Sequence, residues 1–251
     1  MQWKQQKMAK SIRYSGNIGL YALSAEAQEK LTSAKVLVMG AGGLGSNVIM
    51  NLVALGIGQI KIIDKGVVKE EELNRQTIHK FSNIGRAKVI SAKEWIQDFN
   101  HDIKVELDKV ELNELNYFNT IMGYDVIIDC FNSIEGRYML NEIAIRHGKI
   151  LIHGNTNGFF GQITTIFPKK TGCLNCVLQK PTNLKKDDKK ASLITTTSLI
   201  AGLQAQEALK ILTNTGEPLF NKLLVYDGLK NKFQYVEYTK NMVCKSCSEY
   251  M

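Results

Sequence analysis

The segment from Lys35 to Asp64 constrains the fold more than any other part of the chain. It opens with the apolar run Val36 to Met39, which is too short for a buried helix and is typical of a strand covered on both faces. A glycine-rich turn follows, and an apolar helical segment then runs from Leu44 to Leu55. A second predicted strand, Ile60 to Ile63, leads directly into Asp64. This order predicts a nucleotide-binding strand–helix–strand unit.

The turn of this unit contains four glycines in a GxGxxG pattern with one extra glycine, namely Gly40, Gly42, Gly43 and Gly45. Glycines let the backbone turn tightly and approach a phosphate, and the helix start supplies free N–H groups and the positive end of its dipole. Asp64 follows about twenty residues later, where a carboxylate can accept hydrogen bonds from ribose hydroxyls. The alternative interpretation is a glycine turn that only packs the helix against the sheet.

The rest of the chain continues the alternation of strands and helices. Helices are expected over residues 25–33, 86–100, 115–122, 135–147 and 198–212, and strands near residues 105–107, 125–129 and 149–153. After Gly154 the pattern changes, and alternating strands are expected over residues 161–166, 223–226 and 233–236. We therefore expect an α/β fold with a Rossmann-like, doubly wound, mainly parallel sheet and a C-terminal antiparallel extension. Because no linker divides the chain, we expect one domain, residues 1–251, with an N-terminal arm over residues 1–23.

The composition limits the classes of partner. A formal net charge of +8 would suit nucleic acid, but the lysines are scattered except at 185–190, and aromatic residues do not alternate with them. An acidic protein or a polyphosphate ligand explains the charge equally well. No apolar run is long enough to cross a bilayer, and the Lys-rich start has no apolar segment behind it. We expect a cytoplasmic protein that binds neither nucleic acid nor a membrane.

Two Cys-x-x-Cys pairs, Cys173 with Cys176 and Cys244 with Cys247, are separated by a long stretch of chain. Each pair can present two thiolates from one tight turn, so both pairs together can complete a tetrahedral Zn²⁺ site. Four sulfur ligands leave no open position, and such a zinc is structural. A redox dithiol is the alternative, although that motif usually follows the first strand of a thioredoxin-like pattern, which is absent here. Cys130 is expected to be a core thiol.

Two basic residues attract attention. Lys88 is expected in the first turn of a helix, where the positive end of the dipole makes a lysine unfavourable, so a functional role would explain it. Arg75 follows a run of three acidic residues, Glu70 to Glu72. Taken alone, Arg75 is better explained by a surface ion pair with one of these glutamates, and Lys88 by a solvated helix position.

These features occur in one order: the glycine turn, Asp64, the segment Leu73 to Gln76, Lys88, Asp129-Cys130, Gly161-Gln162 and the two cysteine pairs. In this order the chain resembles the MoeB/ThiF/HesA adenylyltransferases, which are bacterial relatives of the ubiquitin-activating enzymes. The resemblance spans roughly Arg13 to the C-terminus. It implies an enzyme that uses ATP to adenylate the C-terminal carboxylate of a small ubiquitin-like sulfur carrier, ThiS- or MoaD-like, with release of pyrophosphate. It further implies a homodimer with a structural zinc, acting in thiamine, molybdopterin or related sulfur-transfer biosynthesis.

The resemblance also implies roles for individual residues. The catalytic residues would be Arg75, Lys88 and Asn132, and residues 155–251 would bind the carrier and hold the zinc. The residues expected to bind ATP and its Mg²⁺ are Gly40, Gly42, Gly43, Asp64, Glu72, Asn74, Arg75, Lys88, Asn132 and Ser133. The chemistry agrees with this set, because a carboxylate that attacks the α-phosphate brings two anions together and needs positive charge and alignment rather than a strong base.

The chain departs from the family pattern at several positions. Asn132 stands where the family commonly has an aspartate that holds magnesium, and Glu72 stands where it has an asparagine. Gly16 replaces an arginine of the N-terminal arm. The loop from Pro181 to Thr197 has no cysteine, so we expect no thioester or persulfide step there. These departures leave open a catalytically impaired module that binds a nucleotide or a carrier. The GxGxxG pattern alone would also allow an NAD-dependent oxidoreductase.

Overall fold

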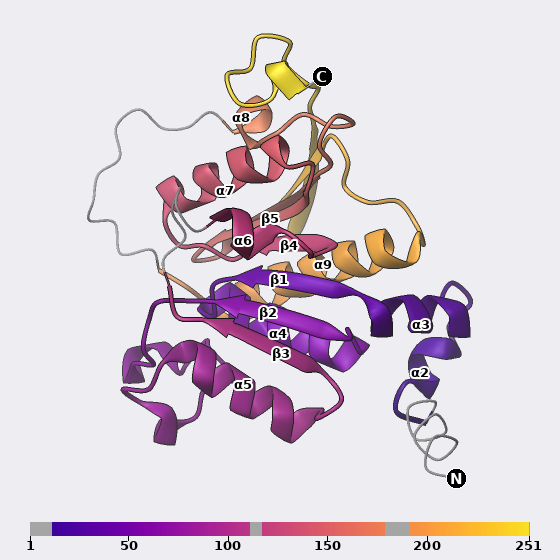
Figure 1. Ribbon diagram of the computed structural model, residues 1–251. Helices are drawn as coiled ribbons and strands as arrows, with labels where there is room; N and C mark the ends of the chain where they lie inside the picture. Colours follow the sequence, from indigo (N-terminus) through magenta and orange to yellow (C-terminus); the bar gives the residue numbers. More distant parts are fainter. Residues whose placement is uncertain (1–11, 111–116, 179–190, 251) are drawn as a thin grey trace.

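The computed structural model describes residues 12–110, 117–178 and 191–250. Within them lies one eight-stranded sheet with the strand order β3-β2-β1-β4-β5-β6-β7-β8 (Figure 1). The parallel part consists of β1 Lys35–Met39, β2 Gln59–Ile63, β3 Lys104–Asp108, β4 Val126–Asp129 and β5 Ile150–Asn157. The antiparallel part consists of β6 Phe160–Ile166, β7 Lys222–Asp227 and β8 Lys232–Glu237. The predicted mainly parallel sheet with an antiparallel C-terminal extension is confirmed.

Helices cover both faces of the sheet, which explains why its central strands are apolar along their whole length. Successive side chains of β1 point to opposite faces: Val36 joins one buried cluster and Leu37 joins another. The first cluster lies under α4 Gly43–Leu55, α5 Lys88–Phe99 and α9 Ile194–Thr213. The second lies under α6 Tyr117–Ile121 and α7 Ile134–Arg146. The short helical turns are η1 Glu70–Glu72, η2 Phe81–Asn83, α8 Leu174–Val177 and η3 Ser248–Tyr250.

The N-terminal segment is attached to the domain from Tyr14 onward. Helix α3 Ala25–Ser33 begins as predicted, with the Ser24 side chain accepting a hydrogen bond from the N–H of Ala27 at 3.2 Å. Before it lies the short helix α2 Ser15–Ile18, which the sequence pattern does not reveal. The Tyr14 ring is buried, and its hydroxyl accepts a hydrogen bond from Asn100 Nδ2 at 2.8 Å. Residues 1–11 of the predicted arm lie outside the described residues.

The boundaries of several elements differ from the prediction for local reasons. Helix α9 begins at Ile194 rather than at the predicted Ser198. The prediction started too late because the first turn contains β-branched threonines, which have low helix propensity. The Thr197 hydroxyl donates back to the carbonyl of Leu193 at 3.1 Å, which holds this turn. Strand β5 extends past the predicted His153 to Asn157, because β6 pairs with it in antiparallel register. Residues 115–116 of the predicted helix lie outside the described part.

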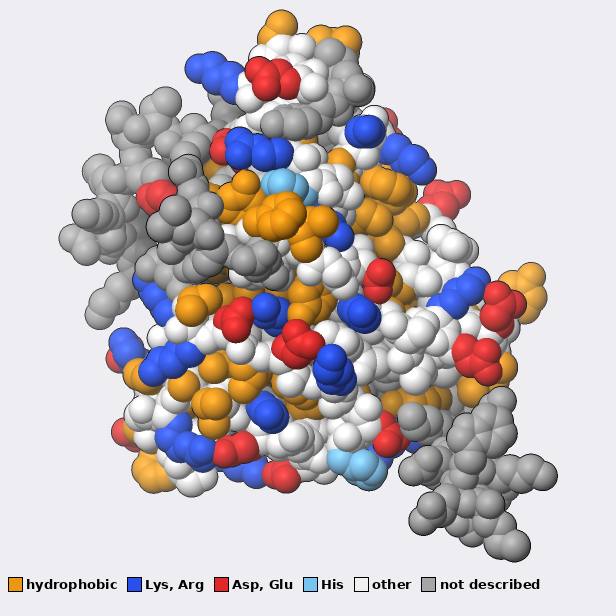
Figure 2. Space-filling view, in the orientation of Figure 1, with side chains coloured by type: hydrophobic (Ala, Val, Ile, Leu, Met, Phe, Trp, Pro, Cys, Tyr) orange, Lys and Arg blue, Asp and Glu red, His pale blue; other side chains and the backbone are white. Residues whose placement is uncertain are grey.

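The surface shows no concentration of one charge on the face drawn in Figure 2, where Lys and Arg side chains are interspersed with Asp and Glu side chains. Exposed apolar side chains also occur, and the edge strand β8 presents three of them, Phe233, Tyr235 and Val236. None of the helices in the described ranges is both long enough and apolar enough to cross a membrane.

Gly45 and Gly202 provide a test of the packing of the glycine turn. A Cβ at Gly45 would lie 1.8 Å from the carbonyl oxygen of Gly40, whereas a Cβ at Gly202 in α9 would meet nothing within 4 Å. We expect Gly45→Ala to lower the free energy of unfolding by about 3 kcal/mol or more through overpacking. Gly202→Ala should raise it by roughly 0.5–1 kcal/mol, because alanine is the better helix former. Urea denaturation of both variants measures the difference, and equal stabilities would contradict the packing described here.

Candidate functional site

The glycines of the turn between β1 and α4 divide into two kinds. Gly40 has φ +111°, and a Cβ there would lie 2.9 Å from the carbonyl oxygen of Cys130, so the fold itself requires glycine. Gly45 is equally enclosed. A Cβ at Gly42 or Gly43 would meet its nearest atom only at 3.9 Å or 3.4 Å. Packing therefore explains Gly40 and Gly45, whereas the backbone at Gly42 lines a space that a ligand can approach and Gly43 is in ordinary contact with side chains.

The carboxylate of Asp64 fixes the position of this turn. Its Oδ2 accepts a hydrogen bond from the N–H of Ala41 at 2.8 Å, and its Oδ1 accepts one from Gly66 at 2.6 Å. His79 holds the same turn from the other side, with its Nε2 3.0 Å from the carbonyl oxygen of Ala41. Burial lowers the pKa of His79. The sequence pattern gave no indication of His79, because its partners, Ala41 and Ser91, lie far away in the chain.

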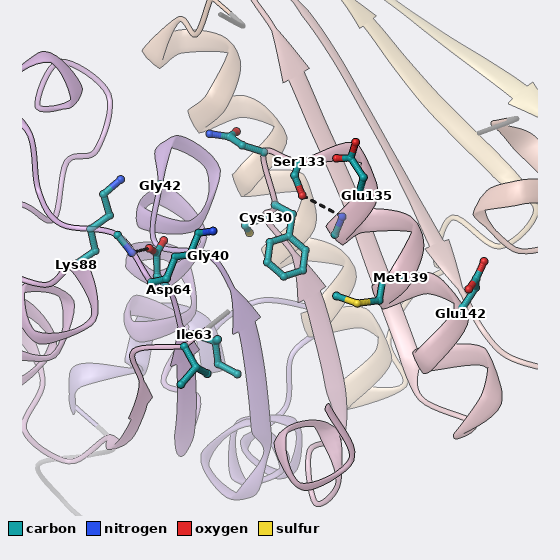
Figure 3. Close-up of a pocket in the computed structure, with 16 residues that line it drawn as sticks. Gly40, Gly42, Ile63, Asp64, Lys88, Cys130, Ser133, Glu135, Met139 and Glu142 are labelled. Atoms are coloured by element: carbon teal, nitrogen blue, oxygen red, sulfur yellow. Dashed lines mark hydrogen bonds between the residues drawn. The ribbon is translucent and has the colours of Figure 1, made fainter. Parts of the chain in front are cut away.

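A cavity of about 800 Å³ opens at the carboxyl ends of β1, β2 and β4 (Figure 3). Six of the predicted site residues line it, namely Gly40, Gly42, Asp64, Lys88, Asn132 and Ser133. Helix α7 forms the opposite wall, from which Glu135, Met139 and Glu142 face the cavity. The remaining predicted residues, Gly43, Glu72, Asn74 and Arg75, are not part of this lining. The structure thus brings most of the predicted set into one cavity and places the rest beside it.

Lys88 is the first residue of α5, and its side chain is only 9% exposed. Its Nζ donates a hydrogen bond to Glu72 Oε1 at 2.8 Å. Burial alone would raise the pKa of Glu72, but the hydrogen bond and the charge of Lys88 outweigh it, and the pKa is lowered. The interpretation of Lys88 as a solvated helix residue is therefore wrong. The sequence placed Lys88 in the correct turn but did not identify Glu72 as its partner.

Arg75 lies beside the glycine turn, outside the cavity lining. One of its terminal nitrogens, NH1, donates to the carbonyl oxygen of Glu71 at 2.8 Å and to the side chain of Asn74 at 2.9 Å. Among the described residues it forms no ion pair, so the surface ion pair considered for it is absent from that part of the chain. Asn47 connects Arg75 to the turn, because its Nδ2 donates to the carbonyl oxygens of Gly43 at 2.7 Å and of Arg75 at 3.2 Å.

A buried polar cluster of Asp129, Arg137 and His153 lies at the end of β4. Asp129 is fully buried, and its Oδ2 lies 3.2 Å from Arg137 Nε and 2.8 Å from His153 Nδ1. Although burial alone would raise the pKa of Asp129, Arg137 and His153 lower it. Arg137 also donates to the carbonyl oxygen of Phe131 at 2.7 Å, which fixes the backbone that leads to Asn132. Sequence reasoning missed Arg137 and His153, because the pairing joins residues of three separate elements.

The four cysteines of the two pairs converge although the pairs are far apart in the chain. Their sulfur atoms all lie within 4.8 Å of one another, and the Sγ–Sγ distances are 3.9 Å for Cys173–Cys176 and 3.6 Å for both Cys173–Cys244 and Cys176–Cys247. Ligands at about 2.3 Å from a tetrahedral Zn²⁺ lie about 3.8 Å apart. Burial raises the pKa of Cys247 to about 12, a cost that a bound cation would offset. This cluster could hold a metal ion, in agreement with the sequence prediction.

Comparison with known proteins agrees with this geometry. A family model described as the ThiF family matches residues 14–246. The chain belongs to the ThiF family. The SAMP-activating enzyme E1 of Haloferax volcanii is 33% identical over 94% of this chain and 88% of that protein. The sulfur carrier protein adenylyltransferase of Thermus thermophilus is 30% identical over 99% of this chain and 94% of that protein.

Solved structures share the fold of this ThiF-family chain. A crystal structure of E. coli MccB with ATP has a TM-score of 0.78 and 25% identity, and the match covers 88% of this chain and 68% of that chain. A second E. coli MccB structure, with MccA-N7isoASN, reaches a TM-score of 0.84 at 24% identity and covers 94% of this chain and 74% of that chain. The resemblance inferred from the sequence is confirmed at the level of the family and of the fold.

Asp129 of this ThiF-family chain offers a test of the buried cluster. Asp129→Asn leaves Arg137, which is 5% exposed, without a charged partner, and we expect a loss of roughly 3–5 kcal/mol in the free energy of unfolding at pH 7. Because the pKa of Asp129 is lowered in the folded state, its stabilisation is complete above the unfolded value of about 3.9 and disappears as the pH falls further.

The difference in stability between the wild type and Asp129→Asn should therefore be full at neutral pH and narrow below about pH 4. Chemical denaturation at several pH values measures it. Asp125→Asn is the matched control, because Asp125 is exposed at the start of the same strand and an amide oxygen can still accept the N–H of Lys35. The control should change stability by at most about 0.5 kcal/mol. A difference for Asp129→Asn that does not vary with pH would contradict the ionised state described above.

Proposed function

We propose that this chain is an ATP-dependent adenylyltransferase that activates the C-terminal carboxylate of a small ubiquitin-like sulfur carrier, ThiS- or MoaD-like. The single observation that carries the proposal is the cavity at the carboxyl ends of the strands, which Gly40, Gly42, Asp64 and Lys88 line together. Membership of the ThiF family and the activities named for its relatives support it. The thiamine, molybdopterin or related sulfur-transfer pathways are the expected setting.

The residues suit a reaction between two anions. The carboxylate of the carrier attacks the α-phosphorus of ATP, a new C(O)O–P bond forms, the bond between the α-phosphorus and its bridging oxygen breaks, and pyrophosphate leaves with both electrons of that bond. No proton needs to be removed, because the attacking carboxylate is already ionised. The backbone at Gly42 and Gly43 and the start of α4 would receive phosphates, and Asp64 would receive the ribose. Lys88 and Arg75 would offset the negative charge that accumulates on the phosphates.

Magnesium would accompany the nucleotide. The oxygen donors in the cavity suit this hard cation, since Asn132 offers an amide oxygen and Ser133 a hydroxyl, and the phosphates of the nucleotide would supply further oxygens. A bound Mg²⁺ supplies charge neutralisation at the phosphates. Ser133 also caps α7, with its Oγ accepting from the N–H of Gly136 at 2.9 Å, so its position is fixed by the fold.

The assembly and the remaining assignments are part of the same proposal. We place the carrier-binding function in residues 155–251, treat residues 1–23 as an arm of a single domain, and expect a homodimer in the cytoplasm. The loop over residues 181–197 has no cysteine, so sulfur would be added to the activated carrier by another protein. The loop itself lies largely outside the described residues.

A second candidate is a module that binds ATP or a carrier without turning it over. The ion pair between Glu72 and Lys88 favours it, because a carboxylate already occupies the lysine. Binding of ATP without carrier-dependent pyrophosphate exchange would support this candidate. An NAD-dependent oxidoreductase leaves the Lys88 pair and the cysteine cluster without a role, and we do not propose it.

Exchange of labelled pyrophosphate into ATP, measured with a candidate carrier, tests the proposed activity. We expect Lys88→Ala and Arg75→Ala each to lower the exchange rate by about 100-fold or more, because each removes a positive charge beside the phosphates. The matched controls are Lys80→Ala and Arg86→Ala, whose side chains are exposed and pair with Asp98 and Glu94 on the surface. They should retain the activity of the wild type. No exchange with any small carrier protein encoded near this gene would refute the carrier assignment.

We also propose that the four-cysteine cluster holds one structural Zn²⁺ per chain. Cys244→Ser should remove the metal and lower the melting temperature, because metal-binding free energy contributes to folding. Elemental analysis and thermal unfolding with and without a chelator measure both effects. Cys130→Ala is the control for metal content, because Cys130 is buried at the cavity and lies outside the cluster. A chain whose melting curve does not respond to chelation would argue against a structural metal.

A further inference from the structure

The charge of Lys88 has an unusual setting. Lys88 is the first residue of a twelve-residue helix, and the free N–H groups and the positive end of the helix dipole lie at the same place. Its side chain is 9% exposed, so water solvates it poorly. The methylenes of the side chain pack beside Gly66, where an added Cβ would lie 3.6 Å from Cδ and Cε. A buried cation at a helix N-terminus requires an anion, and the fold supplies one.

That anion is Glu72, which comes from a different segment, η1. Its Oε1 accepts from Lys88 at 2.8 Å, and its Oε2 accepts from the N–H of Lys69 at 3.2 Å. The side chain is 16% exposed. Because both oxygens are bonded and the backbone of η1 is fixed by the bonds from Arg75 and Gln76 to the Glu72 carbonyl, the carboxylate is held in place. Glu72 therefore holds one of the three N–H donors of Lys88 and neutralises the charge to which a phosphate oxygen would also be drawn.

A phosphate that enters the cavity must compete with this carboxylate. If it takes over Lys88, Glu72 is left as an unneutralised anion next to the phosphates, in a partly buried place where like charges repel strongly. A divalent cation carried by the nucleotide removes that repulsion, because it offers positive charge to the phosphates and to Glu72 together. The two forms of the same ligand should therefore differ in affinity. The metal complex of a nucleoside triphosphate should bind tightly and the metal-free form weakly.

We propose that Glu72 is an internal counter-ion of Lys88 that makes nucleotide binding at this site conditional on a divalent cation. This inference rests on the proposed function, since it assumes that the anion that enters is the triphosphate of a nucleotide. It assigns to Glu72 a role in selecting the ligand and not a role in the chemical step. Glu72 is accordingly a specificity-determining residue beside the cavity, which acts through Lys88.

The chain offers a matched control in the same segment. Glu71 is one residue away and exposed, and in the described structure it does not contact Lys88. Glu71→Gln and Glu72→Gln remove the same formal charge, so any effect of net charge appears in both variants. Only Glu72→Gln removes the negative charge that pairs with Lys88, although the amide oxygen can still accept the hydrogen bond. An effect confined to Glu72→Gln therefore reports the charge pairing with Lys88.

The experiment is titration calorimetry with ATP in excess Mg²⁺ and in EDTA, at equal ionic strength, for the wild type and both variants. The wild type and Glu71→Gln should bind metal-free ATP at least about 100-fold more weakly than Mg-ATP. Glu72→Gln should narrow this ratio by about tenfold or more, equal to about 1.4 kcal/mol, mainly by tighter binding of metal-free ATP. Equal ratios in Glu72→Gln and Glu71→Gln would overturn the proposal, as would a loss of ATP binding in Glu72→Gln under both conditions.

Inorganic tripolyphosphate separates this inference from the proposed function. If no variant binds ATP with or without Mg²⁺, the nucleotide assignment fails, and metal-free tripolyphosphate then decides the role of Glu72. A larger rise in melting temperature for Glu72→Gln than for the wild type and Glu71→Gln would support the counter-ion, and equal rises would overturn it. Glu72→Asn, which is neutral and shorter, serves in the same assays if Glu72→Gln does not fold.

Discussion

The close pass of the glycine turn over the end of β4 is the constraint on which the site depends. At Gly40 the backbone lies so near the carbonyl of Cys130 that a side chain has no room, and Asp64 fixes the next residue by accepting the N–H of Ala41. These contacts join the carboxyl ends of β1, β2 and β4. Because parallel strands end at the same edge of the sheet, one turn determines where the cavity forms.

Two buried ion pairs near the cavity differ in what surrounds them. Asp129 and Arg137 are 0% and 6% exposed, and they are enclosed by His153 and by backbone groups, so no ligand can reach them. Lys88 faces the cavity, and its partner Glu72 comes from a surface segment. Both pairs offset the cost of burying a charge, but they differ in whether a ligand can reach them. The Asp129 pair fixes the scaffold, whereas the Lys88 pair borders the cavity, where an anion that enters could reach it.

The sequence predicted the elements whose cause is local. Short, mostly apolar segments marked β1, β2 and β4, and Ser24 marked the start of α3, because each pattern is complete within a few residues. The pattern of glycines and Asp64 likewise identified the cavity. The first turn of α9 was not predicted, because its threonines have low helix propensity and packing, not propensity, makes this turn helical. The partners of Lys88, Asp129 and Ala41 could not be predicted, because each contact joins segments that only the folded sheet brings together.

Helix α7 shows how the cysteine cluster and the cavity share one structural element. Its start, with Ser133 and Glu135, lines the cavity. Its later turns contact the residues that lie between the two cysteines of each pair. Asn141 Oδ1 accepts from the N–H of Leu174 at 2.9 Å, and Glu142, which also lines the cavity, accepts from Ser246 Oγ at 3.2 Å. A helix of this length transmits displacement because its backbone hydrogen bonds resist bending. The cysteine cluster and the cavity wall are therefore held by the same helix, although none of the four cysteines lines the cavity.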